Sequence, residues 1–536
     1  MQQPKPISRK YDEIVRNVEN GIYQIPKFQR DFVWKKETSA KLIDSLLKGF
    51  PVGSFILWKT KDRLKSLKKI GGEILNETKE GDFVFYILDG QQRITSLYLC
   101  LRGIKAEKES YKEIYIDLDK DIECDDEICV VEKPKNAISF YDLMNEKSSV
   151  LMKQFGEKLF EEKIEKLKEH IVNYEFSTIE IENQSLDKIA DIFTRINTAG
   201  KVLTLFEIMN AKVYIEAKDN QEGFDLEEKF NLLIAELEKS DYDSIVENKS
   251  IILQLIALIL KQNAKREAIL SIDKNDFIKE WDNSTECLKL AIDKIRDSLK
   301  IPVSKLLPYY ALIIPFAYFY HINNKNQPTK SQLENLQKYF FRSAFSERFS
   351  SATESKLNED IKLIDRIQKN EKIDFKKEID CDSSKRLYKE ELKYGFSASS
   401  AFDKAILCIL AYAEPKRFND DTKVRLDNSW LSIVTSKNYH HFFPKAFLKK
   451  QKRYNDEAIN ALANITLVDD YLNKQIIKSR SPKEYIGDFQ VENRNIKQTL
   501  KSHYIDLDNF GILENDYDIF LDKRADLLAD EILKRI

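Results

Sequence analysis

"FYILDGQQRITSLYL", residues 85–99, contains the transition that decides how the N-terminal part of this chain folds. Its first apolar run stops at Asp89-Gly90, and a second apolar segment begins at Ile94. This pattern predicts a buried strand that leads through a tight turn into a helix. The polar residues between them would then lie at the carboxyl end of a strand, where mixed α/β folds bind ligands.

The residues of this turn suit a charged ligand. Gly90 allows close approach of the backbone, and the amides at the start of a helix favour anions. Gln91 and Gln92 offer donors and acceptors, Arg93 offers a fork for phosphate, and Asp89 could hold a metal or a water. The alternative is a structural turn in which Arg93 pairs with Asp89, and the residues alone leave both interpretations open. The chain has no G-x-x-x-x-G-K-[ST] sequence, which argues against a P-loop enzyme.

The composition sets limits on the class of protein. A chain of 536 residues is too long for one ordinary core, so we expect two or three domains. With 42% hydrophobic and 33% charged residues, and few glycines and prolines, it reads as a soluble, mostly helical protein. We expect a cytoplasmic location without a membrane span, because no apolar signal segment or long apolar stretch is evident. The spacing of Cys124 and Cys129 lacks the neighbouring Cys or His that zinc would need.

The order of patterns predicts an α+β fold that is predominantly helical. Strands are expected at Ser54–Trp58, Asp82–Leu88, Glu113–Leu118 and Phe176–Ile181, and helices at Lys36–Gly49 and after Ser185. Thr204 and Glu207 have the spacing of a capping box. From Tyr214 to Ser397 helical periodicity dominates, and Leu306–Tyr320 is expected to form a buried helix pair. We therefore divide the chain into domains at 1–215, 216–396 and 397–536.

Four motifs in the first domain carry a family resemblance. They are "IPKFQRDFVW" (Ile25–Trp34), "LIDSLLKGFPVGSFILW" (Leu42–Trp58), "ILDGQQRITSL" (Ile87–Leu97) and "FTRINTAGKVLTLFEIMNAKV" (Phe193–Val213). In this order and spacing they resemble the ParB/sulfiredoxin-like domain named for its DGQQR motif, found in the GmrS half of GmrSD-type restriction enzymes.

The resemblance implies a site that binds and hydrolyses a nucleoside triphosphate. It implies that the motif lines this site and that a second Gln-Arg pair lies nearby; the residues are Asp89, Gly90, Gln91, Gln92, Arg93, Gln29 and Arg30. Arg195, Asn197 and Gly200 fall in the matching "RINTAG" element, whose role is open.

The histidines provide a second pattern. Of the five in the chain, His440 and His441 are adjacent in "SKNYHHFFPKAF", where the neighbours favour a strand. "ITLV" after Asn464 predicts a second strand, and "DDYLNKQIIKS", which contains Asn473, predicts a helix. A hairpin followed by a helix with these residues resembles the ββα-metal fold of HNH, or His-Me finger, nucleases, and the third domain resembles the GmrD-type C-terminal domain. A buried structural histidine pair is the alternative, and we expect His170 and His503 at the surface.

This second resemblance implies a role for each residue. His441 would be the general base that activates water, and Asn464 would brace the loop that aims it. His440 and Asn473 would hold a divalent metal that stabilises charge. Because this ligand set contains no carboxylate, Mg²⁺ is the default and Mn²⁺ or another transition ion is an alternative.

The charge around the histidine pair favours nucleic acid. Between Ser436 and Lys483 the chain has ten Lys or Arg residues and four acids, whereas its net charge is −2. We expect Lys445, Lys474 and Lys478 to contact DNA phosphates. A solvated surface is the alternative. For Arg342 and Arg348, packing or pairing with Glu347 is a simpler interpretation than phosphate binding.

Together these features predict an NTP-dependent or NTP-regulated DNA endonuclease of the type IV restriction class, which would cleave modified foreign double-stranded DNA in anti-phage defence. The first domain would sense the DNA and turn over the nucleotide, and the helical middle would couple it to the nuclease. Two alternatives remain: a phosphorothioate-sensing nuclease that nicks unmodified invader DNA, and a toxin-like, nucleotide-gated nuclease that acts on RNA. A homodimer is left open as the assembly.

Overall fold

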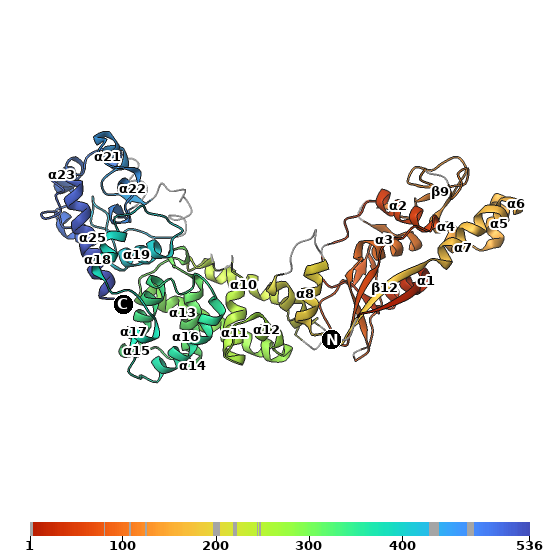
Figure 1. The fold of residues 1–536 in the computed structure, drawn as a ribbon, viewed down its shortest axis with the longest axis horizontal. Coiled ribbons are helices and arrows are strands. Elements are labelled where there is room, and N and C mark those ends of the chain that lie inside the picture. Colours follow the sequence, from red (N-terminus) through yellow and green to blue (C-terminus); the bar gives the residue numbers. More distant parts are fainter. Residues whose placement is uncertain are drawn as a thin grey trace. The chain divides into compact units, whose positions relative to one another are not determined.

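The computed structural model describes residues 4–29, 31–79, 81–106, 109–123, 126–196, 204–217, 222–243, 245, 248–427, 439–468 and 476–536. The chain forms two compact units, Met1–Leu226 and Glu227–Ile536, called here the N-terminal and the C-terminal unit (Figure 1). The helical middle and the C-terminal region of the sequence lie together in the second unit. A finer division of that unit into two domains stays a prediction.

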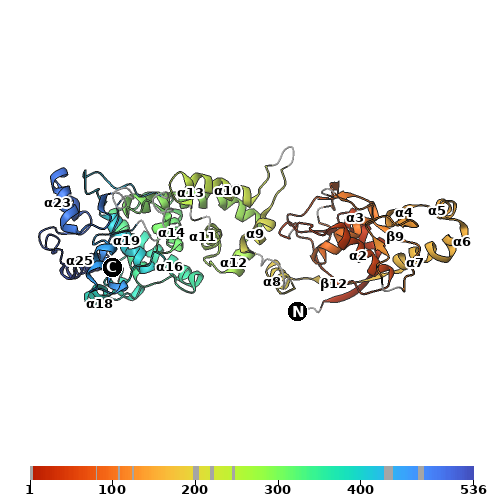
Figure 2. The ribbon, with the colours of Figure 1, turned by 90° about the horizontal axis from the view of Figure 1, so that it is seen from above.

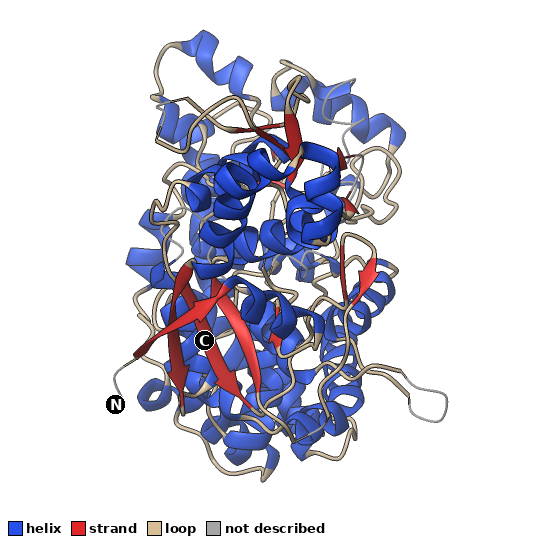
Figure 3. Cartoon of the chain, turned by 90° about the vertical axis from the view of Figure 1, so that its right-hand side faces the viewer, coloured by secondary structure: helices blue, strands red, loops and turns tan. Residues whose placement is uncertain are grey.

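A five-stranded mixed sheet organises the N-terminal unit. Its strands, in spatial order, are β1 (Lys5–Lys10), β12 (Glu175–Glu182), β3 (Phe55–Thr60), β6 (Val84–Asp89) and β2 (Tyr23–Gln24). β12 runs parallel to β3 and β2 parallel to β6, whereas the other two neighbouring pairs are antiparallel. Figure 3 shows these strands in red. The strands expected near residues 54, 82 and 176 are confirmed, and so is β9 (Tyr115–Asp117).

The two faces of this sheet bury different side chains. Phe55, Leu57 and Ile87 lie in the main core together with α1 (Tyr11–Glu19), α2 (Lys36–Leu47), α3 (Gln91–Arg102) and α7 (Glu165–Asn173). On the other face the rings of Trp58 and Tyr86 lie 5.8 Å apart. Because β6 and α3 both contribute to the core, the turn between them is held in place from both sides.

Short elements complete the N-terminal unit. A three-stranded sheet contains β10 (Cys129–Val130), β9 and β11 (Ala137–Ser139), and β4 (Lys69–Ile70) pairs with β5 (Glu73–Ile74), as β7 (Lys105–Ala106) does with β8 (Glu109–Ser110). The remaining helices are α4 (Phe140–Asn145), α5 (Ser148–Phe155), α6 (Glu157–Leu159), α8 (Leu186–Ile196) and α9 (Leu205–Val213). The capping box of Thr204 with Glu207 at the start of α9 is confirmed.

Helices make up the first part of the C-terminal unit, as the sequence predicts. They are α10 (Leu226–Glu238), α11 (Ser250–Lys261), α12 (Arg266–Ser271), α13 (Lys274–Ser298), α14 (Ile313–Ile322), α15 (Lys330–Phe345), α16 (Thr353–Gln368), α17 (Phe375–Glu378), α18 (Lys385–Glu391) and α19 (Ala401–Tyr412).

The prediction of a helix pair at Leu306–Tyr320 is wrong. Two 3₁₀ turns, Ser304–Leu306 and Tyr310–Leu312, lead into the single helix α14. Pro308 explains the difference, because proline disfavours helical backbone in the residue before it. Pro315 is tolerated because it lies in the first turn of α14, where its missing N–H has no helical partner to lose.

A small two-stranded sheet lies at the centre of the candidate nuclease region. β13 (His440–His441) pairs antiparallel with β14 (Ile465–Thr466), so that His440 lies opposite Thr466. The predicted pair of strands is thus confirmed, while most of the helix expected around Asn473 lies outside the described residues. The other elements are α21 (Lys445–Gln451), α22 (Asp456–Ile459), the 3₁₀ turn η5 (Leu462–Asn464), α23 (Pro482–Glu492), α24 (Ile496–Lys501) and α25 (Tyr517–Leu533).

A ladder of ion pairs joins α18 to α25, which Figures 1 and 2 show side by side. Lys385, Lys389 and Lys393 follow one another at intervals of four residues, and so do their partners Asp522, Asp526 and Asp530. The shortest contacts are 2.8–3.0 Å, and Lys385 and Lys389 each contact two carboxylates. The ladder connects the last helix of the chain to the helical middle.

None of the helices in the described part of the chain combines the length and apolar character needed to cross a bilayer.

Replacing Lys389 with Met should lower the free energy of unfolding of the C-terminal unit by about 1 kcal/mol at low salt, because networked ion pairs contribute more than isolated ones. The loss should shrink in about 1 M NaCl, where charges are screened over about 3 Å. Urea unfolding at both salt concentrations measures this. Lys377→Met is the matched control, since Lys377 is 83% exposed and reaches Asp374 only at 3.8 Å. An equal loss at both salt concentrations would contradict a role of the ladder.

Candidate functional site

The DGQQR turn lies between the end of β6 and the start of α3, as the sequence predicts. Gly90 has a φ of +88°, and a Cβ there would approach Phe55 Cδ1 to 2.4 Å, so only glycine fits. α3 begins without a side-chain cap. The first backbone N–H groups of α3 can therefore donate to an anion.

Arg93 uses its guanidinium within the protein. Nη1 donates to the carbonyl of Val52 at 2.6 Å, and Nη2 donates to the carbonyl of Ser54 and to Asp89, at 3.1 and 3.0 Å. Gly53 leaves room for this contact, since a Cβ there would lie 2.4 Å from Nη1. The pair of Arg93 with Asp89, which the structural alternative predicted, is present. Arg93 therefore clamps the loop before β3 against the DGQQR turn.

The glutamines differ in their partners. Gln92 accepts from the backbone N–H of Val33 at 2.9 Å and donates to the carbonyl of Asp31 at 3.1 Å. Gln29 donates to the carbonyl of Ile87 in β6. These amides bring the "FQRDFVW" segment to the turn, as expected for Gln29, while Arg30 lies outside the described residues. Gln91 is different, because its Nε2 is buried and has no hydrogen-bond partner.

Four other residues that the sequence singled out belong to the N-terminal unit. Arg195 is exposed on α8, and Asn197, Gly200 and Cys124 lie outside the described residues. The groups best suited to bind a ligand here are thus Nε2 of Gln91 and the first backbone N–H groups of α3.

In the C-terminal unit the histidine pair is buried in β13. The Nδ1 atom of His440 lies 2.8 Å from Thr466 Oγ1, and that hydroxyl donates to the carbonyl of His440 at 3.2 Å. A hydroxyl that donates its proton elsewhere accepts from the ring, so Nδ1 carries the proton and Nε2 the lone pair. Nε2 is buried without a partner. Burial, with smaller effects of His441, His503 and Arg524, holds the pKa of His440 well below its usual value.

His441 is held by an amide that the sequence did not single out. Its Nε2 lies 2.9 Å from Asn460 Oδ1, and Asn460 Nδ2 donates to the carbonyl of Phe396 at 2.8 Å, which fixes the amide. A neutral ring carries a single N–H, and the backbone of Tyr439 is a second hydrogen-bond partner of this ring. Burial lowers the pKa of His441 to about 4, with a further lowering by Lys445, while hydrogen bonds to Asn460 and the Tyr439 backbone oppose both. His441 is therefore a neutral imidazole at pH 7.

Asn464 makes the bracing contacts that the sequence predicts. Its Oδ1 accepts from the backbone N–H of Phe443 at 2.8 Å, and its Nδ2 donates to the carbonyl of the same residue at 3.0 Å. The N–H of Phe442 donates to the backbone carbonyl of Asn464 at 2.8 Å. The loop after His441 is thus fixed by one fully buried side chain.

A divalent metal, which the nuclease resemblance implies, would need deprotonated ligands at this place. His440 fits as one ligand, because its Nε2 is an unpartnered acceptor. The described residues contain no group of three His, Cys, Asp or Glu side chains that could hold a metal, and Asn473 lies outside them. The described part of the chain therefore supplies one fitting ligand and not a complete set.

The basic residues near the histidines divide into two groups. Lys449, Arg453 and Arg480 pair with Asp456, Asp518 and Asp488. Lys445 and Lys478 are exposed, and no ion pair involves them in the described part of the chain. Lys474 and Lys437 lie outside the described residues. Lys445 and Lys478 are thus the expected phosphate contacts that remain available.

Two residues differ from the sequence-based expectation, and a third, Arg342, packs as expected. His503 was expected at the surface, but it is 2% exposed, with its ring 4.9 Å from that of Phe418 and its Nε2 donating to the carbonyl of Lys416 at 2.7 Å. Arg348 pairs with Asp360 and Glu359 and not with Glu347. Arg342 packs inside the unit and donates to the carbonyl of Ile379 at 2.8 Å.

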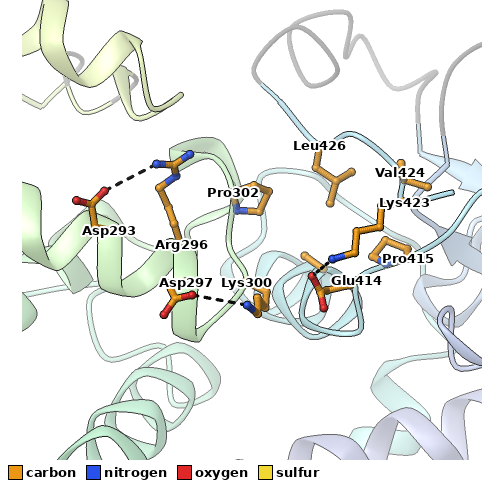
Figure 4. A pocket seen from close by; sticks show the side chains of 11 residues that line it. Asp293, Arg296, Asp297, Lys300, Pro302, Glu414, Pro415, Lys423, Val424 and Leu426 are labelled. Carbon is orange, nitrogen blue, oxygen red and sulfur yellow. Dashed lines mark hydrogen bonds and ion pairs between the residues drawn. The ribbon is translucent and has the colours of Figure 1, made fainter. Parts of the chain in front are cut away.

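A cavity of about 440 Å³ in the C-terminal unit was not predicted either (Figure 4). Each cation drawn there has an acid near it: Arg296 has Asp293, Lys300 has Asp297, and Lys423 has Glu414. Because these charges balance, the cavity does not favour a phosphate, and we assign no ligand to it.

Comparison with known proteins finds a family that the N-terminal unit resembles. Residues 11–214 match the GmrSD restriction endonuclease, N-terminal domain. The chain is similar to GmrSD restriction endonucleases. The match covers the DGQQR turn, α9 and the sheet except for its edge strand β1, and it agrees with the resemblance seen in the sequence. It supports a GmrSD-like restriction protein, a nuclease class whose substrate is DNA.

A second similarity extends over both units. An uncharacterized protein of Methanocaldococcus jannaschii is 25% identical, and the alignment covers 98% of this chain and 98% of that protein. The similarity therefore reaches beyond the GmrSD N-terminal domain into the region of the histidine pair.

The buried histidines should make stability depend on pH. Burial lowers the pKa of His503 to about 4, while an unfolded histidine titrates near 6.5. Its neutral ring thus stabilises the fold above pH 6.5, and this contribution, at most about 3 kcal/mol, is lost as the pH falls from 6.5 towards 4. His503→Gln, which does not titrate, should show a smaller loss of unfolding free energy between pH 7 and 4.5 than the wild type. Equal losses in urea unfolding would contradict the assignment.

Proposed function

We propose that this protein is a nucleotide-regulated DNA endonuclease of the type IV restriction class that cleaves modified DNA. The observation that carries the proposal is the match of residues 11–214 to the GmrSD N-terminal domain. The C-terminal unit supplies the nuclease in this proposal, through the histidine pair on β13 and the amide that braces the loop after it. Double-stranded DNA is the partner, and a nucleoside triphosphate and a divalent ion are the cofactors.

In the nuclease centre each residue has one task. His441, neutral at pH 7, takes a proton from the attacking water, while Asn460 holds the ring at Nε2. Asn464 keeps the following loop in the geometry that aims His441. Lys445 and Lys478 contact DNA phosphates. His440 and Asn473 would hold the divalent ion, which would act as a Lewis acid when bound.

In the N-terminal unit the nucleotide would lie at the start of α3. The helix amides and Nε2 of Gln91 would contact its phosphates or its base, since Nε2 lacks a partner and α3 begins without a side-chain cap. Arg93 would act differently from the sequence-based expectation. Its contacts with Val52 and Ser54 place it in the wall of the site, where it fixes the turn.

The direct test is cleavage of four DNA substrates by the purified chain. Unmodified, hydroxymethylated, glucosylated and phosphorothioated duplexes are each incubated with every NTP and with Mg²⁺ or Mn²⁺. Cleavage of a modified duplex that depends on an NTP supports the proposal. Nicking of the unmodified duplex but not of the phosphorothioated one would favour the phosphorothioate-sensing alternative, and cleavage of all four without NTP would rule out gating by modification.

His441→Ala should reduce DNA cleavage by at least about a hundredfold, because it removes the general base. DNA binding should persist, since the phosphate contacts are separate lysines. The rate is measured on the cleaved duplex and the affinity by fluorescence anisotropy. His170→Ala, an exposed histidine in the N-terminal unit, is the control and should cut normally. If His441→Ala cuts near the wild-type rate, the histidine is structural.

Gln91→Leu should abolish nucleotide binding and leave the melting temperature unchanged, because the amide nitrogen it removes has no partner. Arg93→Ala should instead lower stability by about 2–3 kcal/mol, since it leaves the Val52 and Ser54 carbonyls without their donor. Equilibrium binding of a fluorescent NTP and thermal unfolding separate the two effects. Normal nucleotide binding by folded Gln91→Leu would place the nucleotide elsewhere.

A further inference from the structure

Arg524 on α25 is a buried cation without a counter-ion. Its side chain is 0% exposed, and no carboxylate pairs with it among the described residues. Burial lowers its pKa to about 9, so the guanidinium is still charged at pH 7. A well-packed apolar side chain at such a position is often no less stable than a buried charge, so stability alone does not account for an arginine here.

The guanidinium joins two backbone segments that are distant in the sequence. Nη1 donates to the carbonyl of Ala463 at 2.8 Å, and Nη2 donates to the carbonyl of His503 at 2.9 Å. The first carbonyl belongs to η5, and the second to the turn after α24. A planar fork can satisfy both carbonyls in one fixed geometry, which a single ammonium group or an apolar side chain cannot do.

The first of these contacts lies directly behind the nuclease loop. Ala463 precedes Asn464, whose side chain holds both backbone polar groups of Phe443. The backbone carbonyl of Asn464 holds the N–H of Phe442, the residue after His441. From Arg524 to the base the chain of contacts is therefore continuous: guanidinium, Ala463 carbonyl, Asn464, Phe442–Phe443, His441.

We infer that Arg524 is a positioning residue of the nuclease centre: its fork fixes η5, and through Asn464 it sets the loop that carries His441. The catalytic part of this inference rests on the proposed function, whereas the positioning part can be tested without it. α25 is suited to this task because its opposite face is tied to α18 by the ladder of lysines and aspartates.

The experiment compares Arg524→Met, Arg524→Lys and Arg342→Met with the wild-type full chain. Arg342 is the matched control, because it is also buried in the C-terminal unit and donates through Nε and Nη2 to a backbone carbonyl, that of Ile379. Amide hydrogen exchange of peptides that cover residues 439–447 reports the positioning, urea unfolding reports global stability, and single-turnover cleavage at saturating DNA reports the chemical step.

We expect Arg524→Met to speed exchange of the Phe442 and Phe443 amides at least about tenfold beyond what its change in global stability explains. Arg342→Met should lower stability without this local effect. Arg524→Lys, which keeps the charge but reaches fewer acceptors, should lie between Arg524→Met and the wild type, and it carries the test if Arg524→Met does not fold. Single-turnover cleavage at saturating DNA should be slower for Arg524→Lys than for the wild type.

The outcomes separate the two hypotheses. If the amides of Phe442 and Phe443 exchange as in the wild type in a folded Arg524 variant, or equally fast in Arg342→Met, the positioning role is overturned. If exchange follows the expectation but the wild-type chain cuts none of the DNA substrates, the positioning role stands and the proposed nuclease function fails.

Discussion

Buried backbone carbonyls outside regular structure must find donors, and both candidate sites depend on how this constraint is met. In the N-terminal unit Arg93 donates to the carbonyls of Val52 and Ser54 beside the DGQQR turn. In the C-terminal unit Arg524 donates to those of Ala463 and His503 behind the histidine pair. In each case a guanidinium fork ties an irregular segment to a helix, so that the helix positions the residues next to it.

This constraint also explains which residues remain for a ligand. Once Arg93 and Gln92 are committed to the backbone, the buried polar atom of the motif that has no partner is Nε2 of Gln91. Once Asn464 and Asn460 hold the loop and the ring of His441, the free buried nitrogen of the pair is Nε2 of His440. The side chains with the most hydrogen bonds form the frame of each site, and those with unmet hydrogen-bonding capacity are the candidates for binding.

The sequence predicts what local patterns determine. The change from an apolar run to Asp89-Gly90 predicts β6 and α3, and the spacing of Thr204 and Glu207 predicts the start of α9, because periodicity and capping act within a few residues. The two strands β13 and β14 follow from their composition, and their register would also have pointed to Thr466 as the neighbour of His440.

The partners that could not be predicted are distant in the sequence or lie on the backbone. Arg93 meets Val52, and Arg524 meets Ala463, through carbonyl groups that every residue possesses, so no side-chain pattern marks them. Asn460 lies four residues before Asn464 in "AINALANITLV", and its role depends on the fold of the segment between them. The expectation for His503 failed for the same reason, because Phe418 and the carbonyl of Lys416 cover it from far along the chain.

The charge near His441 links substrate binding to base strength. Lys445 is exposed and contributes to the lowered pKa of His441, which leaves a neutral but weak base in the free protein. A phosphodiester bound at Lys445 would offset this positive charge and raise the pKa of His441 towards the pH at which the reaction runs, where a general base works best. Burial is the larger cause of the low pKa of His441, so under the proposed function DNA bound at Lys445 offsets only the smaller of the two effects that weaken the base.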